Sequence, residues 1–364
     1  MKILIYVGHP AQYLFFRQSI KTLLSKGHSI ILLIKTKDVL EDIIKGDNIN
    51  YINIIRQPRG NSKISIAFSL IRRNLLILPI ILREKPDLLV GGDPSISQIG
   101  WLLCKNRFTL TEDDYPIIKT LADLTFPFAQ YILCPKVCDT GRWYRKKIGY
   151  DGYMKLAYLH PNQFAPNRQI LSKYNIVGKY VLIRLAQLTA HHDFGIKGLN
   201  HSELNKIIAA IKSKGYKVFI SSEGELANSI SEYKLTINPS DIHHILAFSS
   251  LLISDSQSMS VEASMLGTPS IRYSDFAGRI SVLEELEHKY KLTFGILPSK
   301  TNALLSKINE LLSVHDLSEI FKKRRQAMLK DKINVSDFTT WFLENYPRSA
   351  QIMIKNPEYQ NNFK

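Results

Sequence analysis

The sequence has little cysteine and no long uncharged apolar run. Cysteine occupies three of its 364 positions, 104, 134 and 138. That number is too small for a disulfide scaffold, and the odd count is typical of reduced thiols in the cytosol. Cys134 and Cys138 have no second Cys or His pair at zinc-finger spacing, so we expect no metal site.

The sequence also lacks targeting and membrane-spanning segments. Residues 1–8 form an apolar run of strand length, which is shorter than the apolar core of a signal peptide. Residues 64–82 are the most apolar later stretch, but Arg72, Arg73 and Pro79 interrupt it, and a spanning helix needs about 20 nearly uncharged residues. We therefore expect a cytoplasmic protein, peripheral at the inner face of the membrane at most.

Positive charge is in excess. Lys and Arg number 48 and Asp and Glu number 32, so the formal net charge is +16. Such a charge favours an anionic partner, which is a nucleic acid, a membrane surface or a phosphorylated substrate. The cations are scattered and form no compact RNA- or DNA-binding motif, so we expect no nucleic-acid partner.

The charge excess is larger in residues 1–165, at +10, than in residues 166–364, at +6. Several cations of the first part are expected near exposed aromatic side chains such as Trp143 and Tyr144, a combination that suits an anionic bilayer. The alternative is a face that only confers solubility. These cations are Arg72, Arg73, Arg142, Arg145, Lys146 and Lys147.

Apolar runs alternate with amphipathic stretches in both halves of the chain. This alternation predicts an α/β protein in which two doubly wound, Rossmann-like domains face each other across a cleft, the GT-B architecture. We place the acceptor domain at residues 1–162, the nucleotide-sugar domain at 163–330, and a returning helix with a polar tail at 331–364. The tail from residue 347 is expected to fray.

Polar residues follow the predicted strands of the first half, where ligands bind in open parallel sheets. Gly8 and His9 follow the first strand. The glycine allows a ligand to approach closely, and the histidine is an acid, a base or a phosphate donor, or else makes only a structural hydrogen bond. Asp93 follows the fourth strand and is either a general base or the cap of the next helix.

An acidic run at the next strand end contains Glu112, Asp113 and Asp114. Adjacent carboxylates repel one another, and burial of one of them is how a general acid or base arises. The alternative is a solvated acidic turn. In the second half, Arg184 ends a strand and a polar loop carries His192 and Asp193, which we expect to contact phosphate or sugar instead of a metal.

The sharpest segment spans residues 254–269. A strand ends at Asp255, and Ser256 and Ser258 open a helix whose backbone N–H groups and hydroxyls suit a diphosphate. Glu262 lies one turn further on the same side and is suited to accept hydrogen bonds from ribose hydroxyls. Neither a dinucleotide fingerprint nor a P-loop is present. The alternative is an ordinary capped helix with a buried glutamate.

Residues 255–269 resemble the nucleotide-sugar motif of GT-B enzymes, among them the UDP-N-acetylglucosamine 2-epimerases. The resemblance implies that the two serines hold the diphosphate and that Glu262 holds the ribose. Asp93 looks like the catalytic aspartate of the epimerases, and Glu112 lies near the place of a second catalytic carboxylate.

The whole chain resembles a family of unknown function related to GT-B glycosyltransferases. The resemblance implies that Ser222, Glu223 and His243 also contact the nucleotide sugar. Its motifs lie in order at residues 8–11, 124–129, 157–159, 192–193, 222–223, 241–243 and 255–269. Two epimerase segments are replaced here, one by residues 122–128 and the other by Arg184 with residues 191–193, so the epimerisation half of the site departs from the family.

These observations favour a glycosyltransferase that moves a sugar from a nucleotide-activated donor, its substrate, to a glycan or lipid-linked acceptor in surface polysaccharide assembly, such as capsule or lipopolysaccharide. His9, Asp93 or Glu112 would deprotonate the acceptor hydroxyl, with no separate cofactor and no metal. The alternative is a nucleotide-sugar 2-epimerase that uses Asp93, Glu112 and Asp113.

Overall fold

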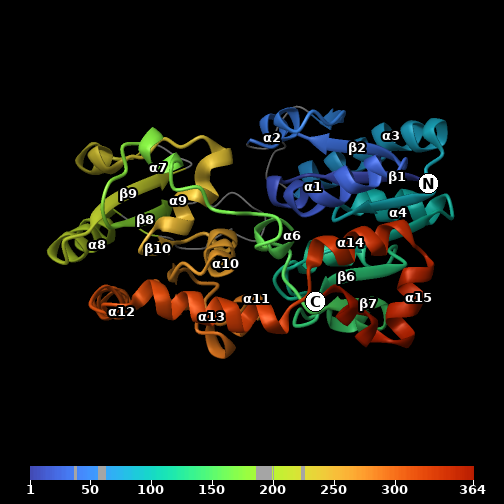
Figure 1. The fold of residues 1–364 in the computed structure, drawn as a ribbon. Helices are drawn as coiled ribbons and strands as arrows, with labels where there is room; N and C mark the ends of the chain where they lie inside the picture. The colour runs from blue at the N-terminus through green and yellow to red at the C-terminus, as the bar shows by residue number, and fades with distance from the viewer. Residues whose placement is uncertain (37–38, 56–62, 186–198, 200, 223–225) are drawn as a thin grey trace. The chain divides into compact units, whose positions relative to one another are not determined.

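The computed structural model describes residues 1–36, 39–55, 63–185, 199, 201–222 and 226–364 (Figure 1). The chain divides into two compact units: unit 1 is Met1–His160 with Lys332–Lys364, and unit 2 is Pro161–Asp331. Each unit holds one sheet of parallel strands. The predicted α/β class with two Rossmann-like halves is confirmed.

The sheet of unit 1 has seven strands in the order β3-β2-β1-β4-β5-β6-β7. Its central strands β1 and β4 are apolar because helices cover both faces, as in the nearly fully buried residues 3–7. The chain changes direction between β1 and β4, which is the switch point at which open α/β sheets bind ligands. The strands are β1 (Lys2–Val7), β2 (Ser29–Lys35), β3 (Ile52–Ile55), β4 (Leu88–Gly91), β5 (Asn106–Leu110), β6 (Tyr131–Pro135) and β7 (Lys147–Tyr150).

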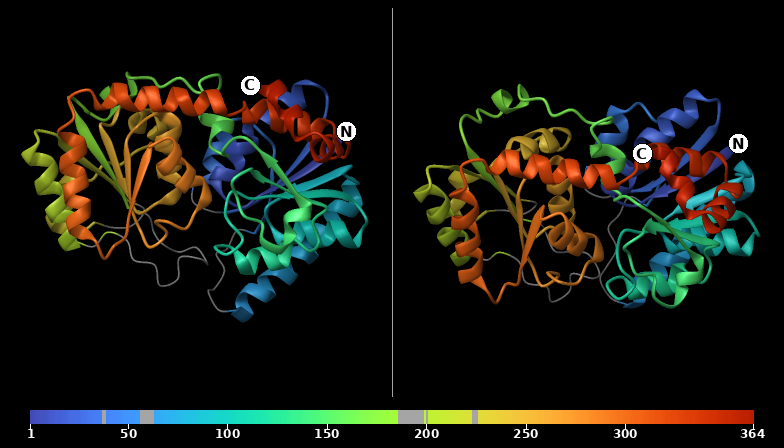
Figure 2. Two further views of the ribbon diagram at one scale, coloured as in Figure 1. Left: turned by 90° about the horizontal axis from the view of Figure 1, so that it is seen from below. Right: turned by 60° about the horizontal axis from the view of Figure 1, so that its bottom comes forward.

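The helices of unit 1 form two layers, one on each face of the sheet (Figure 2). The first layer contains α1 (Pro10–Ser25), α2 (Leu40–Gly46), α6 (Leu156–Leu159) and α14 (Val335–Glu344). The second contains α3 (Lys63–Glu84), α4 (Pro94–Leu102) and α5 (Lys119–Thr125). The remaining helices are η1 (Gly141–Lys146), α15 (Arg348–Lys355) and η5 (Pro357–Phe363).

The sheet of unit 2 has five strands in the order β12-β11-β10-β8-β9. Its switch point lies between β8 and β10, which are register partners from Leu251 and Val181 onward. The strands are β8 (Tyr180–Leu185), β9 (Lys217–Ser222), β10 (Leu251–Ser254), β11 (Ser270–Tyr273) and β12 (Thr293–Ile296).

The helices of unit 2 include two packed pairs, α8 with α12 and α9 with α10. In the described part of the chain, no helix is both long and apolar enough to cross a membrane. The helices are α7 (Ile170–Lys173), α8 (His201–Ser213), η2 (Asn228–Tyr233), η3 (Pro239–Asp241), α9 (Ile242–Phe248), α10 (Gln257–Leu266), α11 (Ser281–Glu284), η4 (Glu285–Lys289), α12 (Thr301–Leu312) and α13 (Leu317–Asp331).

The C-terminal segment returns to unit 1 and packs there. Helix α14 crosses α1 where the hydroxyls of Ser19 and Thr340, both buried, lie 3.0 Å apart in a hydrogen bond. Phe338 of the same helix is fully buried beneath the aromatic rings that follow it. The small serine lets the two helices approach closely, so α14 completes the first helical layer.

The expectation that residues 347–364 fray is wrong. Trp341 stacks on Tyr359 at 4.8 Å between ring centroids and contacts Phe363 at 5.4 Å. The buried Gln360 accepts a hydrogen bond of 2.6 Å from the backbone of Asp151. Polar residues lie between the aromatic residues of the tail, so the sequence predicts a solvated segment. In the structure the helical turns bring Tyr359 and Phe363 to the same side, where both contact Trp341.

Deleting residues 357–364 should therefore destabilise unit 1 by about 3 kcal/mol, the cost of removing one large buried aromatic group. For a unit of this size that lowers the melting temperature by roughly 6–12 °C, measurable by calorimetry. Glu358→Ala, at an exposed tail position, is the control and should melt like the parent chain. Unchanged melting of the truncated chain would contradict the assigned packing.

Candidate functional site

The loop after β1 brings Gly8 and His9 to the switch point of unit 1. The backbone N–H of Gly8 donates to Gln12 at 2.8 Å. His9 is the N-cap of α1, where its ring Nδ1 accepts a 3.1 Å hydrogen bond from the backbone N–H of Ala11. An accepting Nδ1 carries no hydrogen, so the hydrogen of the neutral ring is on Nε2. The structure therefore contains the structural hydrogen bond that the sequence left as an alternative.

Asp93 caps the neighbouring helix α4 and also forms an ion pair. One carboxylate oxygen accepts from the backbone N–H of Ser95 at 2.9 Å, and the other lies 3.1 Å from the guanidinium of Arg73 on α3. Burial disfavours the charge on Arg73, but Asp93 and Tyr6 more than offset this and hold the Arg73 pKa above its ordinary value. Asp93 thus serves as a helix cap and as the counter-ion of a buried arginine.

The acidic run after β5 is divided among different partners. Glu112 accepts from the backbone N–H of Met154 at 2.6 Å and pairs with the buried Lys155 at 2.8 Å. Asp114 is buried and accepts from the backbone N–H of Asp139 at 2.6 Å. Asp113 is half-buried, and its backbone N–H donates to the hydroxyl of Thr111. The run is therefore not a solvated acidic turn, because Glu112 and Asp114 are held by hydrogen bonds from other segments of unit 1.

In unit 2 the ends of β8 and β10 are joined by side chains. The hydroxyl of Ser254 donates to the carbonyl of Arg184 at 3.1 Å, and the guanidinium of Arg184 donates to Ser221 at 2.8 Å. Ser222 follows at the end of β9 and is half-buried. Arg184, Ser222 and the start of α10 therefore lie at one edge of the sheet, as the strand-end argument predicts.

The start of α10 leaves two backbone donors without a partner among the described residues. Ser256 is the N-cap, with its hydroxyl accepting from the backbone N–H of Met259 at 3.4 Å and its own N–H donating to Ser254. The next two N–H groups, of Gln257 and Ser258, have no acceptor among the residues that the structure describes. Exposed amides at a helix N-terminus carry partial positive charge, so this end of α10 is suited to an anion.

Glu262 and His243 lie together on facing helices. The His243 ring Nε2 is 3.4 Å from a Glu262 carboxylate oxygen, and both side chains are mostly buried. Phe164 contacts His243 edge-on at 6.1 Å between ring centroids. The structure thus brings together two residues that the sequence assigned separately to the nucleotide. His192, Asp193 and Glu223, which the sequence also assigned to it, lie outside the described residues.

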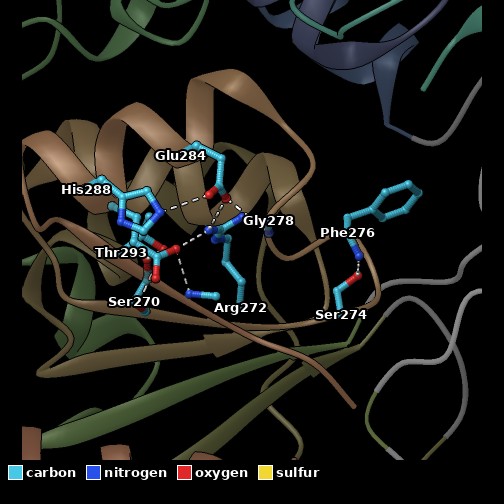
Figure 3. A network of polar contacts seen from close by, with 10 residues as sticks. Ser270, Arg272, Ser274, Phe276, Gly278, Glu284, His288 and Thr293 are labelled. Atoms are coloured by element: carbon cyan, nitrogen blue, oxygen red, sulfur yellow. Dashed lines mark hydrogen bonds and ion pairs between the residues drawn. The ribbon is translucent and has the colours of Figure 1, made fainter. Parts of the chain in front are cut away.

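The end of β11, beside Ser254 in the sheet, is held by the fully buried Arg272 (Figure 3). Its guanidinium donates to Glu287 at 2.5 Å and to Glu284 at 3.5 Å. The carboxylate of Glu284 also accepts from the backbone N–H of Gly278, which fixes the loop that follows β11. A β-carbon at Gly295 would meet the guanidinium at 2.8 Å, so a side chain there would force the Arg272 cluster to shift.

Sequence reasoning missed Arg73, Lys155 and Arg272 as components of the two sheet edges. Arg73 had been grouped with surface cations, but residues 72 and 73 point about 100° apart on a helix, so one of the two faces the core. Lys146 and Lys147, grouped with them, each donate to backbone carbonyls of unit 1 instead. Two adjacent cations within an apolar helix are the signal in the sequence that one of them faces the core, and the structure shows that it is Arg73. Among the described residues, no cluster of His, Cys, Asp and Glu could hold a metal ion.

Gly295→Ala should lower the stability of unit 2 by about 1–3 kcal/mol, because the added methyl group overpacks against Arg272. Denaturant unfolding measures the difference. Gly46→Ala, at a helix end where a β-carbon meets nothing within 4 Å, is the matched control. Equal unfolding midpoints for the two variants would show that the Arg272 cluster is looser than described.

Comparisons with known proteins address the fold. No family model matches the sequence, and no curated protein matches it. Solved structures do match at low sequence identity. S. aureus MnaA with UDP is 13% identical, with 96% of this chain and 97% of that chain covered and a TM-score of 0.66.

Two further structures give the same result. The UDP-GlcNAc 2-epimerase of Methanocaldococcus jannaschii in complex with UDP-GlcNAc and UDP is 15% identical, with 90% of this chain and 100% of that chain covered and a TM-score of 0.62. A glycosyltransferase from Rickettsia africae is 16% identical, with 98% and 99% covered and a TM-score of 0.60. The chain therefore has the GT-B fold that UDP-GlcNAc 2-epimerases and glycosyltransferases share.

Proposed function

We propose that the chain is a glycosyltransferase that binds the nucleotide part of a nucleotide-sugar donor at the start of α10 in unit 2. The observation that carries the proposal is the pair of N–H groups of Gln257 and Ser258, which have no acceptor in the described part of the chain and lie about one helical turn from Glu262. A diphosphate fits the amides and the helix N-terminus, and ribose hydroxyls are donors suited to the carboxylate.

The proposal is supported by the ligand that two solved structures of similar fold contain. S. aureus MnaA and the M. jannaschii epimerase contain UDP, and both share the fold of this chain. Arg184 at the end of β8 and His243 beside Glu262 add groups that suit phosphate and nucleotide at the same sheet edge. The residues of this edge supply hydrogen-bond donors for a leaving diphosphate without a metal ion.

In the proposed reaction the acceptor binds to unit 1. The acceptor hydroxyl gives its proton to a carboxylate of unit 1, for which Asp93 and Glu112 are the candidates, and its oxygen forms a bond to the anomeric carbon of the donor sugar. The bond from that carbon to the diphosphate breaks, and the nucleoside diphosphate leaves with the electron pair. The Nε2–H of His9, at the edge formed by β1 and β4, is suited to donate a hydrogen bond to an anionic group in this step.

The setting we propose is surface polysaccharide assembly, with a glycan or a lipid-linked glycan as the acceptor. A nucleotide-sugar 2-epimerase is the second candidate, because structures of that activity share the fold. The replacement of two epimerase segments, by residues 122–128 and by Arg184 with residues 191–193, favours the transferase over the epimerase. Both reactions need a group that takes up a proton, and Asp93 and Glu112 are each engaged by a buried cation and a backbone N–H.

Glu262→Gln should weaken UDP binding by about 10- to 100-fold, because hydrogen bonds to a charged group contribute about 1.5–3 kcal/mol. Isothermal titration with a panel of nucleoside diphosphates measures the change and identifies the base. Glu310→Gln, at an exposed position on α12, is the matched control. If Glu262→Gln bound UDP with unchanged affinity, the nucleotide would not bind at α10 as proposed.

His9→Asn should retain the cap of α1 and the nucleotide affinity but lower turnover by about 100-fold or more, because asparagine is a good N-cap without an imidazole. Turnover is followed as transfer of labelled sugar to a membrane-derived acceptor fraction. Full turnover in His9→Asn would show that His9 acts only as a helix cap.

The parent chain decides between the two candidate reactions. Without an acceptor, the transferase should leave each nucleotide sugar unchanged. Conversion of one nucleotide sugar into its 2-epimer under those conditions would contradict the transferase and support the epimerase.

A further inference from the structure

Helix α3 has apolar side chains on two opposite faces. Its inner face packs on the sheet of unit 1 through Ile77 and Ile81, which are at most 1% exposed. Its outer face carries Phe68, Ile71, Leu75 and Leu82, which are 68%, 57%, 67% and 54% exposed. Because positions 68, 71, 75 and 82 recur at helical spacing, these four side chains form one stripe, which we call the α3 face.

The α3 face differs from the outer face of an ordinary surface helix. Helix α13, for comparison, presents exposed lysines, a glutamate and an aspartate to solvent. Helix α3 contains four cations and one carboxylate, Glu84 at its last position, which pairs with Arg83 at 2.9 Å. Arg73 is turned inward to Asp93, whereas Arg72 and Arg83 are exposed. At 100° per residue, Arg72 and Arg83 lie within about 20° of each other on one side of the stripe.

The apolar surface extends to the neighbouring helix of the same layer. Helix α4 lies beside α3, joined to it by a 2.9 Å hydrogen bond between Asn74 and Gln98. At its end Trp101 and Leu102 are 55% and 64% exposed. Figure 2 shows α3 on the outside of unit 1, on the side of the sheet away from α14. A cluster of large exposed apolar side chains is typical of an interaction surface and not of a surface that only faces solvent.

The chemistry of the α3 face selects its partner. Aliphatic and aromatic side chains flanked by arginines match the boundary between acyl chains and anionic headgroups. A second copy of the chain fits less well, because two such faces would bring arginines together with a single carboxylate on each helix, Glu84, to pair with them. A chain with a net charge of +16 is also attracted to an anionic surface as a whole.

We propose that the α3 face docks on an anionic lipid bilayer, with Phe68, Ile71, Leu75 and Leu82 among the acyl chains and Arg72 and Arg83 at the lipid phosphates. The inference deepens the proposed function and rests on it in one respect, since it explains how the enzyme meets an acceptor carried by lipid. Lipid binding itself needs no nucleotide, so the two proposals fail separately.

The test is flotation of the full chain with vesicles, in the absence of nucleotide. The parent chain should float with vesicles that contain phosphatidylglycerol and much less with pure phosphatidylcholine. The double variant Leu75→Gln with Leu82→Gln should bind anionic vesicles at least about 30-fold more weakly, because two apolar side chains no longer enter the bilayer. Leu24→Gln, on the exposed side of α1 in the other helical layer, is the matched control and should bind like the parent.

Three results of the flotation and light-scattering measurements would overturn the proposal. They are equal flotation with neutral and anionic vesicles, flotation of the double variant at the parent level, and a parent chain that forms a dimer through α3 and does not float. Light scattering of the parent and the double variant detects the dimer. UDP titration of the double variant checks the nucleotide site: intact UDP affinity with lost flotation supports lipid docking through α3 alone, and lost UDP affinity with lost flotation would show a general defect and overturn the assignment to this face.

Discussion

The buried ion pair between Arg73 and Asp93 joins α3 to the end of β4, and much of unit 1 depends on it. A guanidinium with so little solvent around it needs a fixed counter-charge, and Asp93 supplies one from the cap of α4. The pair sets the rotation of α3 about its own axis. Once Arg73 points inward, Ile77 and Ile81 must face the sheet, and Phe68, Ile71 and Leu75 must face outward. The strand-end loop and the apolar surface are therefore two results of one contact.

The two units use their sheet edges differently. In unit 1, Asp93 and Glu112 are engaged by Arg73 and Lys155, so this edge is internally neutralised. In unit 2, the first amides of α10 keep their hydrogen-bonding capacity. A preformed set of donors costs little reorganisation when an anion binds, whereas a neutralised edge orders its loops before any ligand arrives. The fold thus combines a binding edge with a rigid one.

Sequence reasoning recovers the strands that are continuous apolar runs, such as residues 3–7 and 251–254, because glycine, serine or proline bounds them, but it does not place β7 or β12. It also places Ser256 at the start of a helix, because the hydroxyl pattern is local. It fails where the partner is distant. Lys155 is 43 residues from Glu112, and no local pattern connects them. The tail was misread for the same reason, since Trp341 and Tyr359 meet only after the chain has turned back.

The return of the C-terminal segment also sets an order of events during synthesis. Unit 1 is built from two separate stretches of chain, and its aromatic cluster needs Tyr359 and Phe363. Unit 2 is one continuous stretch that ends at Asp331. On a ribosome, all of unit 2 therefore emerges before the residues that complete unit 1, although the seven strands of unit 1 are made before unit 2. Until α14 has been made, the apolar surface of α1 that it covers stays exposed, so unit 1 can be completed only after the whole of unit 2 has been synthesised.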